Sequence, residues 1–398
     1  MKNKILIIII FLLIVIILIL ENKEPEELPS STDIKTNNNT FEIYEKHYVK
    51  ELIKESNVEI INSEDLLPNE ELGKHTYLLK IKVKKKEYTY PIEYELKDST
   101  PPVFIKASSN LTILNDDMQD LCEKIVYADN YDSHPTCKVL GTYEQGKKGT
   151  YQGLEFIITD SSGNEKKWPF TLNIIEKTPS STPSQTKQYL PIDEVLKKYK
   201  TSKTSIGIDV SRWQGNVDFQ KVKDAGIEFV IMRIGAQVSK EDSLDMDSKF
   251  LTYYEAAKNV GLKIGVYVYN TATTKEGGKK TAEWVIEQLH GDSLDLPVAY
   301  DFEDWANFME YESSLYSLSS AYKEFEKTLK EHGYEAMLYS SKFYLENVWM
   351  NYEDSNIWLA HYTDQTNYQG KYMLWQMSSL GRVDGITENT VDIDILYQ

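Results

Sequence analysis

The stretch Leu296–Trp305, LPVAYDFEDW, decides how the chain can be interpreted. Its apolar residues predict a buried strand that ends in two carboxylates, Asp301 and Glu303. Residues two apart on a strand point to the same face, with Cα atoms ~6.5 Å apart. Two acids in one space repel each other, so one tends to keep its proton near neutral pH, which is the starting point for general-acid chemistry. The alternative is a solvated acidic turn, and this stretch alone does not decide between the two.

Length, charge and cysteine content narrow the possibilities. The 398 residues exceed what one hydrophobic core organises, so we expect two or three domains. The net charge of −18 argues against a nucleic acid partner, because the phosphate backbone would be repelled. Outside the membrane, Cys122 and Cys137 are expected to form a disulfide, the alternative being two buried free thiols. No CxxC motif or Cys/His cluster occurs, so we predict no metal site and no cofactor.

An apolar run, Ile5–Leu20, follows Lys2 and Lys4 near the N-terminus. As a helix it reaches ~24 Å, which leaves a signal peptide and a membrane anchor both open. The polar flank after Leu20 has no small-x-small cleavage site, so we expect residues 1–21 to be an uncleaved anchor. No cysteine directly follows the run, which excludes a lipoprotein anchor. The lysines place the N-terminus in the cytoplasm and predict a single-pass protein of the cell membrane with extracellular downstream domains.

The polar residues 22–40 predict a flexible stalk, and the pattern then changes to short alternating strands over residues 41–175. Turns rich in Gly, Asp, Asn and Ser separate several of these strands, which is typical of small β-sandwiches. The expected strands are Tyr77–Val83, Tyr88–Tyr94, Val103–Ile105, Leu154–Thr159 and Phe170–Ile174.

Four motifs in this region resemble the bacterial immunoglobulin-like modules of surface proteins. They are Asp98-Ser-Thr-Pro-Pro102, Asp129-Asn-Tyr-Asp132, Gly149-Thr-Tyr151 and Thr159-Asp-Ser-Ser-Gly-Asn164. The resemblance implies one module over residues 98–175, of a kind that acts as a spacer or adhesive unit. Residues 41–97 are interpreted as a possible divergent copy. Residues 176–204 are expected to be a linker, because Glu176–Gln188 is rich in Pro, Ser and Thr, and a short amphipathic segment, Ile192–Tyr199, leads into the next domain.

From residue 205 to 398 strands and helices alternate, which predicts an α/β barrel of parallel strands. Apolar stripes at helical spacing follow the early strands, for example Phe250, Tyr253, Tyr254 and Ala257. About 190 residues are few for a (β/α)₈ barrel, which typically has ~250. Two segments, 361–372 and 378–390, lack a helical period, so we expect a flattened barrel without helices in its second half. The expected strands are Ile206–Val210, Phe229–Ile234, Lys263–Tyr269, Pro297–Phe302, Ala336–Ser340, Ile357–Ala360, Met373–Met377 and Val391–Ile395.

Acidic residues follow several of these strands. Because the carboxyl ends of parallel barrel strands meet on one face, acids distant in sequence converge there. Asp209 ends the first strand, Asp301 and Glu303 end the fourth, and Asp392 and Asp394 lie in the last. Such a cluster destabilises the fold through repulsion, and a chance surface would scatter these residues. The pattern therefore favours a catalytic site over a solvated turn.

The residues around these acids resemble glycoside hydrolase family 25, the Chalaropsis-type lysozymes or N-acetylmuramidases. The matching motifs are Gly207-Ile-Asp-Val-Ser-Arg-Trp-Gln-Gly215, Phe229-Val-Ile-Met-Arg233, Gly265-Val-Tyr-Val-Tyr269, Asp301-Phe-Glu303, Ile357-Trp-Leu-Ala360, Leu374-Trp-Gln376 and Val391-Asp392. The resemblance covers residues 205–398. It implies hydrolysis of the β-1,4 bond between N-acetylmuramic acid and N-acetylglucosamine, with peptidoglycan glycan strands as the partner.

The resemblance also implies roles for the acids. Glu303 would be the general acid that protonates the leaving glycosidic oxygen. Asp301 would be the partner carboxylate, which either stabilises the oxocarbenium-like transition state or orients the substrate's 2-acetamido group. Asp209 and Asp392 would hold substrate or tune the field, and the family pattern favours Asp392 over Asp394. The two-residue spacing leaves the stereochemical outcome open.

Aromatic residues in or just after the strands are candidates for binding sugar rings. They are Tyr267, Tyr269, Tyr339, Trp358, Tyr362 and Trp375. A core position is an equal alternative for each except Tyr269 and Trp375, which coincide with family positions near the acids. Arg233 ends the second strand, and two interpretations stay open for it: a hydrogen-bond partner of the acids, or a salt bridge to a loop.

Two other hypotheses remain beside the muramidase. The first is an inactive wall-binding or adhesive protein whose barrel acts as a lectin, but binding alone would not need a close pair of like charges. The second is a glycosidase with the same chemistry that acts on another amino-sugar polymer such as chitin. Only its substrate distinguishes this glycosidase from a muramidase.

Overall fold

The computed structural model describes residues 28–176, 189–240 and 242–397, and the chain divides into two compact units between Ser99 and Thr100. The predicted anchor, residues 1–21, lies outside the described residues. None of the helices in the described part of the chain is long and apolar enough to cross a membrane. The anchor therefore stays a prediction.

The first unit is an all-β module with one short 3₁₀ helix. Its main sheet has the order β2-β6-β5-β4, and β1 pairs separately with β3. Alternate residues of the long hairpin, such as Leu79 and Ile81 on β5, are fully buried and form the core with Val49 and Leu52. The elements are β1 (Ile34–Thr36), β2 (Thr40–Glu42), η1 (Val49–Leu52), β3 (Ile53–Ser56), β4 (Glu59–Ile60), β5 (Gly73–Val83) and β6 (Lys86–Lys97).

The predicted stalk over residues 22–40 is wrong at its C-terminal end. Strand β1 lies inside it, and the side chain of Asn37 donates a hydrogen bond to the carbonyl of Glu51 at 2.8 Å. A short edge strand needs few apolar residues, so its polar composition hid it.

The second unit begins with a second all-β module that repeats the first. Its main sheet has the order β10-β11-β12-β8, and β7 pairs with β9. In both modules the second strand runs parallel to the last one, β2 with β6 and β8 with β12. The two modules thus share a strand order, while the interpretation of residues 41–97 as a divergent immunoglobulin-like copy and the immunoglobulin-like assignment of residues 98–175 both stay predictions. The elements are β7 (Val103–Lys106), β8 (Asn110–Leu114), η2 (Leu121–Lys124), β9 (Val126–Ala128), β10 (Thr136–Leu140), β11 (Gly149–Thr159) and β12 (Glu165–Ile175).

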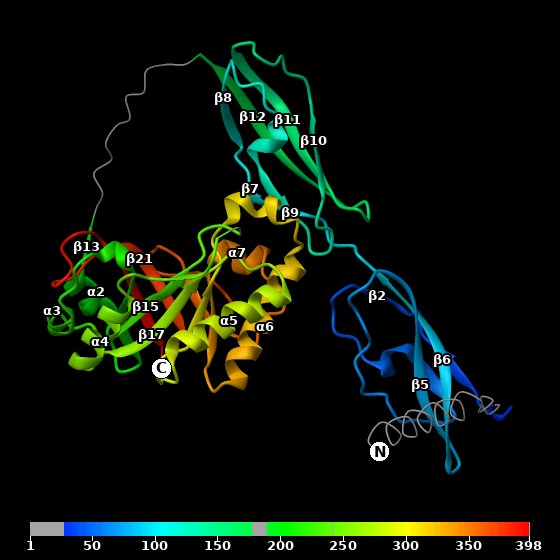
Figure 1. Ribbon diagram of the computed structural model, residues 1–398. Coiled ribbons are helices and arrows are strands. Elements are labelled where there is room, and N and C mark those ends of the chain that lie inside the picture. The colour runs from blue at the N-terminus through cyan, green and yellow to red at the C-terminus, as the bar shows by residue number, and fades with distance from the viewer. Residues whose placement is uncertain (1–27, 177–188, 241, 398) are drawn as a thin grey trace, which may run out of the picture. The chain divides into compact units, whose positions relative to one another are not determined.

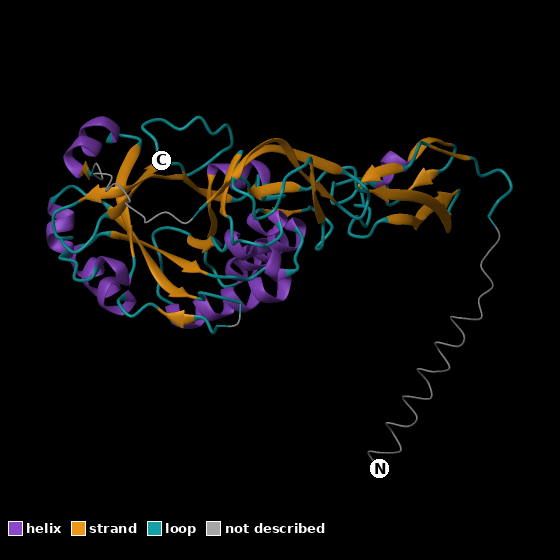
Figure 2. Ribbon diagram, turned by 90° about the horizontal axis from the view of Figure 1, so that it is seen from above, coloured by secondary structure: helices purple, strands orange, loops and turns teal. Residues whose placement is uncertain are grey.

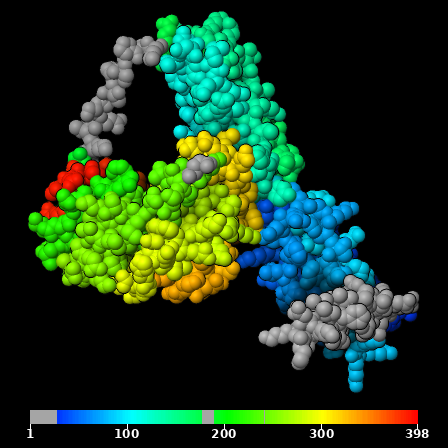
Figure 3. Space-filling model, viewed as in Figure 1, coloured from blue at the N-terminus to red at the C-terminus, as the bar shows by residue number. Residues whose placement is uncertain are grey.

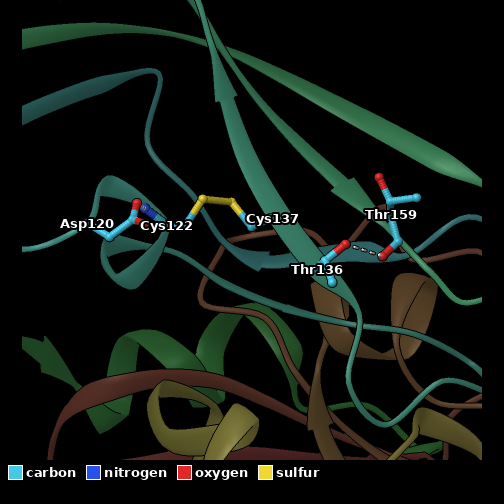
Figure 4. Close-up of a disulfide and its surroundings, with 5 residues drawn as sticks. All are labelled: Asp120, Cys122, Thr136, Cys137 and Thr159. Carbon is cyan, nitrogen blue, oxygen red and sulfur yellow. Dashed lines mark hydrogen bonds between the residues drawn. A yellow bond between two sulfur atoms is a disulfide. The ribbon is translucent and has the colours of Figure 1, made fainter.

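A disulfide joins Cys122 and Cys137 in this second module, as the sequence predicts. Figure 4 shows that it links η2 to β10. Asp120 caps η2 by accepting a hydrogen bond from the backbone N–H of Cys122. The bridge thus fixes the short helix against the edge of the sheet.

The rest of the second unit is a closed barrel. Strands β14, β15, β17, β18, β19, β20 and β21 run parallel, and β22 closes the barrel antiparallel to both β14 and β21. The prediction that every strand is parallel is therefore wrong for β22, because an apolar period carries no information on strand direction. The elements are β14 (Thr204–Val210), β15 (Phe229–Ala236), β16 (Asp245–Met246), β17 (Lys263–Tyr269), β18 (Val298–Asp301), β19 (Ala336–Ser341), β20 (Asn356–Ala360), β21 (Leu374–Arg382) and β22 (Val391–Tyr397).

Helices cover only part of the barrel wall (Figures 1 and 2). The four residues of the stripe predicted on α4, from Phe250 to Ala257, are all buried against the sheet. Gly261 ends this helix in the left-handed conformation, with φ +71°. Helix α7 follows β19, so the prediction that the second half of the barrel lacks helices is wrong at this point, whereas no helix follows β20 in the described residues. The helices are α2 (Ile192–Tyr199), η3 (Arg212–Gln214), α3 (Phe219–Asp224), α4 (Phe250–Val260), α5 (Lys275–Leu289), η4 (Trp305–Tyr311), α6 (Leu315–Glu331) and α7 (Lys342–Asn347).

The barrel starts before residue 205. Strand β13 (Leu190–Pro191) pairs with β21, and α2 buries Ile192 and Val195 in the barrel core. The predicted linker over residues 176–204 thus contains structured residues from Leu190 onward.

Within the second unit the second module packs on the barrel. The backbone N–H of Leu315 donates to the carbonyl of Asp129 at 2.8 Å, at the start of α6. Ile105 and Val126 share a hydrophobic core with barrel residues. In Figure 3 the yellow atoms of the η4 region lie against the cyan and green atoms of this module. The segment that follows the acids of β18 is therefore buttressed by the module.

Candidate active site

Four predicted acids come together at one mouth of the barrel. Asp209 lies near the end of β14 directly opposite Asp392 on β22, and Asp301 is the last residue of β18. Asp392 reaches this mouth because β22 is antiparallel, so the beginning of β22 lies beside the ends of the other strands. Burial raises the pKa of the Tyr267 hydroxyl, and the charges of Asp209, Asp301 and Asp392 raise it further.

The surroundings favour the neutral forms of these acids. Asp301 is only 4% exposed, and its Oδ1 receives no hydrogen bond from any described residue. Burial, and then the charges of Glu303 and Asp209, raise its pKa well above the ordinary value. Burial and the charges of Asp209 and Glu303 raise the pKa of Asp392 to about 8. Two neighbouring carboxyl groups in such a site do not both ionise near neutral pH.

Glu303 lies two residues beyond the end of β18, in the loop before η4. Its side chain is exposed at the mouth, yet enough protein surrounds the carboxyl group that burial raises its pKa. It lines a pocket of about 490 Å³ together with Tyr339, Tyr362 and His361. A carboxyl group that keeps its proton and faces an open pocket can donate that proton to a bound molecule.

Arg233 does not hydrogen bond to the acid cluster. Its Nε donates to Oδ2 of Asp247 at 2.8 Å, and its Nη2 lies 2.6 Å from the same oxygen. The open question from the sequence is thus decided in favour of a salt bridge to a loop, since Asp247 lies between β16 and α4. The positive charge of Arg233 still lowers the pKa of Asp301.

Gln376 on β21 joins several side chains of the mouth through hydrogen bonds, a role that the sequence did not predict. Its Oε1 accepts hydrogen bonds from the hydroxyls of Tyr339 and Tyr362, each at 2.9 Å. Its Nε2 donates to Oδ2 of Asp209 at 2.8 Å. The sequence did contain a signal for this role. Side chains alternate between the two faces of a strand, so only one of the adjacent residues Trp375 and Gln376 can face the barrel interior.

The same alternation makes the prediction for Trp375 wrong. Because Gln376 points inward, Trp375 points outward, where its Nε1 donates to the carbonyl of His361 and its ring meets Tyr199 edge-on. Trp358 is fully buried and belongs to the barrel interior, below the pocket. Neither residue lines the pocket.

The remaining predicted tyrosines face the acids. Burial and the charges of Asp301 and Glu303 raise the pKa of Tyr269 to about 12, so its hydroxyl stays protonated and can donate hydrogen bonds. Tyr267 lies inside the barrel among the acids, and Tyr339 lines the pocket.

Comparisons with known proteins agree with this geometry. Residues 208–386 match the model of the family "Glycosyl hydrolases family 25". The autolytic lysozyme of Clostridium acetobutylicum is 32% identical over 190 residues, which are 47% of this chain and 54% of that protein. Lysozyme M1 of Streptomyces globisporus is 26% identical over 194 residues, 46% of this chain and 64% of that protein. The chain thus spans less than two thirds of the length of either relative.

Among solved structures, a family 25 glycosyl hydrolase from Bacillus anthracis is 18% identical and has a TM-score of 0.43. The alignment covers 50% of this chain and 92% of that one. The match to the family model includes Asp209, Asp301 and Glu303, three of the acids that meet at the mouth of the barrel. Over residues 208–386 the barrel of this protein therefore matches the glycosyl hydrolase family 25 domain.

Proposed function

We propose that the protein is a peptidoglycan hydrolase that cleaves the β-1,4 bond between N-acetylmuramic acid and N-acetylglucosamine. The observation that carries the proposal is Glu303, a carboxyl group with a raised pKa that faces an open pocket beside a second, buried acid, Asp301. The match to the family 25 model and the similarity to two proteins named lysozymes support the same activity.

The proposal also includes the place of the proton within the pair. Burial alone favours the neutral form of both carboxyl groups, but the charge of Arg233 lowers the pKa of Asp301. Burial and the charges of Glu303 and Asp209 raise the pKa of Asp301, and Arg233 is the one group among the described residues that lowers it, so within this proposal we assign the negative charge to Asp301 and the proton to Glu303. In that state Glu303 protonates the leaving glycosidic oxygen, and Asp301 stabilises the positive charge that develops on the sugar or orients its acetamido group.

The setting of the enzyme is also part of the proposal. The apolar run of residues 1–21 would hold the chain in the cell membrane, with the domains outside. The two β modules would then separate the barrel from the membrane, so that it reaches the glycan strands of the wall. Their repeated strand order suits a spacer built from one unit used twice.

Digestion of purified peptidoglycan by the full chain tests the activity. We expect soluble fragments that carry muramic acid at the reducing end, identified by mass spectrometry. Fragments with glucosamine at the reducing end, or release of fragments only from chitin, would replace the muramidase with another glycosidase. Binding to the wall without any fragments would indicate a lectin.

A further inference from the structure

Below the acids of the mouth lies another carboxyl group, that of Asp394 on β22, which the proposed mechanism does not use. Its side chain is fully buried. Oδ1 accepts a hydrogen bond from the indole Nε1 of Trp358 at 2.8 Å. Oδ2 receives no hydrogen bond from an N–H or O–H group of the described residues. Its neighbour is the carboxyl group of Asp209, close enough for a hydrogen bond between the two side chains once one of them carries a proton.

Strand register explains how the two carboxyl groups come together. Asp394 lies opposite Gly207 on β14 and opposite Gln376 on β21. Asp209 follows Gly207 by two residues on the same face of β14. The hydrogen bond from Gln376 Nε2 to Asp209 therefore runs from one neighbour of β22 to the other and passes over Asp394. This arrangement separates Asp394 from the open pocket.

The contacts around Asp209 favour a proton between the two acids. The tyrosine hydroxyls that donate to Oε1 of Gln376 fix its amide, so Nε2 must face Asp209. One oxygen of Asp209 is thus committed to Gln376. A hydrogen bond between two carboxyl groups exists only when one of them is protonated, and two buried carboxylates side by side are strongly unfavourable. Burial raises the pKa of both groups.

We propose that Asp394 and Asp209 share one proton at working pH, and that Asp394 is the positioning residue that fixes the side chain of Asp209. The shared proton keeps the negative charge of the pair low in the barrel, away from Glu303. The effect on Glu303 rests on the proposed function, but the shared proton between Asp394 and Asp209 does not. The titratable and charged groups that face the pair are Asp392 on β22, Asp301 at the end of β18, Glu303 in the loop after it, Tyr267 on β17, Tyr339 on β19, Tyr362 after β20 and Arg233 on β15.

Infrared spectroscopy of the full chain tests the shared proton directly. The wild-type protein should show the carbonyl absorption of neutral carboxyl groups at pH 7. Asp394→Asn and Asp209→Asn should each remove the same part of this absorption, equal to one carboxyl group, and the double variant should remove no more. Asp384→Asn, which alters an exposed acid between β21 and β22, should remove none.

Additive losses in the double variant would mean two separate protons and would overturn the proposal, as would an unchanged spectrum of Asp394→Asn. If a variant fails to fold, an infrared titration of the carboxyl groups of the wild-type protein tests the shared proton instead. Lack of neutral carboxyl absorption at pH 7 then excludes a shared proton.

The pH profile of lysis tests the positioning role. In Asp394→Asn the amide can donate to Asp209 and stabilise its ionised form, so negative charge moves toward Glu303. We expect the alkaline limb of the profile to move to higher pH, and that of Asp384→Asn to stay in place. An unmoved limb in Asp394→Asn contradicts the role. If the wild-type chain lyses no peptidoglycan, the proposed function fails while the infrared result still decides the pair.

Discussion

Acidic side chains have opposite surroundings in the first unit and at the barrel mouth. In the first unit, Lys35 pairs with Glu55 and Lys50 with Glu64, and all four side chains are more than half exposed. At the barrel mouth, Asp301 is buried, and the neighbouring Arg233 is already bound to Asp247. Exposed ion pairs change the free energy of unfolding very little, whereas buried acids without a cation destabilise the fold. Where a chain keeps such acids, we expect the position to have a use, which in the proposed mechanism is to hold protons.

The largest expected effect is on catalysis. Glu303→Gln removes the proton donor but keeps the shape of the side chain. We expect lysis of purified peptidoglycan to fall on the order of 10² to 10⁴-fold, while binding to insoluble peptidoglycan persists. Glu64→Gln, in an exposed pair of the first unit, should leave the rate unchanged. Turbidity assays and pull-down measure the two quantities, and full activity of Glu303→Gln would remove the acid assignment.

The next effect is on stability. Arg233→Met leaves the carboxylate of Asp247 buried without its partner, since that side chain is only 1% exposed. Breaking such a pair costs about 3–5 kcal/mol of the free energy of unfolding. The matched change in the first unit, Lys50→Met, breaks an exposed pair and should have little effect.

Chemical denaturation of both variants measures the difference. The double variant Arg233→Met/Asp247→Leu should recover part of the loss, because it leaves no unpaired charge. Equal losses in Arg233→Met and Lys50→Met would contradict the contrast between the two regions.

The two β modules sharpen the comparison, because they share a strand order but only one has a disulfide. The bridge from Cys122 to Cys137 closes a loop of about 15 residues, for which the chain-entropy model gives about 3 kcal/mol. We expect reduction to make residues 100–176 more sensitive to limited proteolysis. The first module has no cysteine and serves as the internal control. Equal changes in both modules would show that the reductant acts elsewhere.

The strands of the barrel could be predicted from sequence because each is an apolar run of the right length. Lys263–Tyr269 is one case, in which the expected strand and β17 have the same bounds. The direction of β22 could not be predicted, since alternation is the same when read from either end. The structure alone revealed that Asp392 reaches the mouth through an antiparallel strand.

The candidate site was predictable at the level of residue types but less so at the level of contacts. The gathering of Asp209, Asp301 and Glu303 follows from strand ends, which the sequence reveals. The roles of Trp375 and Gln376 depend on which of two adjacent side chains faces inward, and a shift of one residue reverses them. The partner of Arg233 is Asp247, and no local pattern links the two.

The smallest effect, and the one that separates the two regions most directly, is the pH dependence of stability. The folded pKa of Asp392 is raised to about 8, above the ordinary value of about 4 that applies to the unfolded chain. Between these values the folded barrel binds more protons than the unfolded chain, so its free energy of unfolding falls as the pH rises. The limit is about 1.4 kcal/mol per pH unit for one group, and less for Asp392 because water partly screens it.

The first unit should respond in the opposite sense. A hydrogen bond from His47, and then one from the backbone of Tyr48, lower the pKa of Glu51. Its contribution is therefore present at neutral pH and is lost as the pH falls below about 4. Calorimetry of the full chain between pH 5 and pH 8 should show a transition of the second unit that moves to lower temperature and a transition of the first unit that stays in place. Asp392→Asn should flatten the first of these trends. A barrel that gains stability over this range would mean that its acids are ionised in the folded state, and the mouth would then hold no protons to donate.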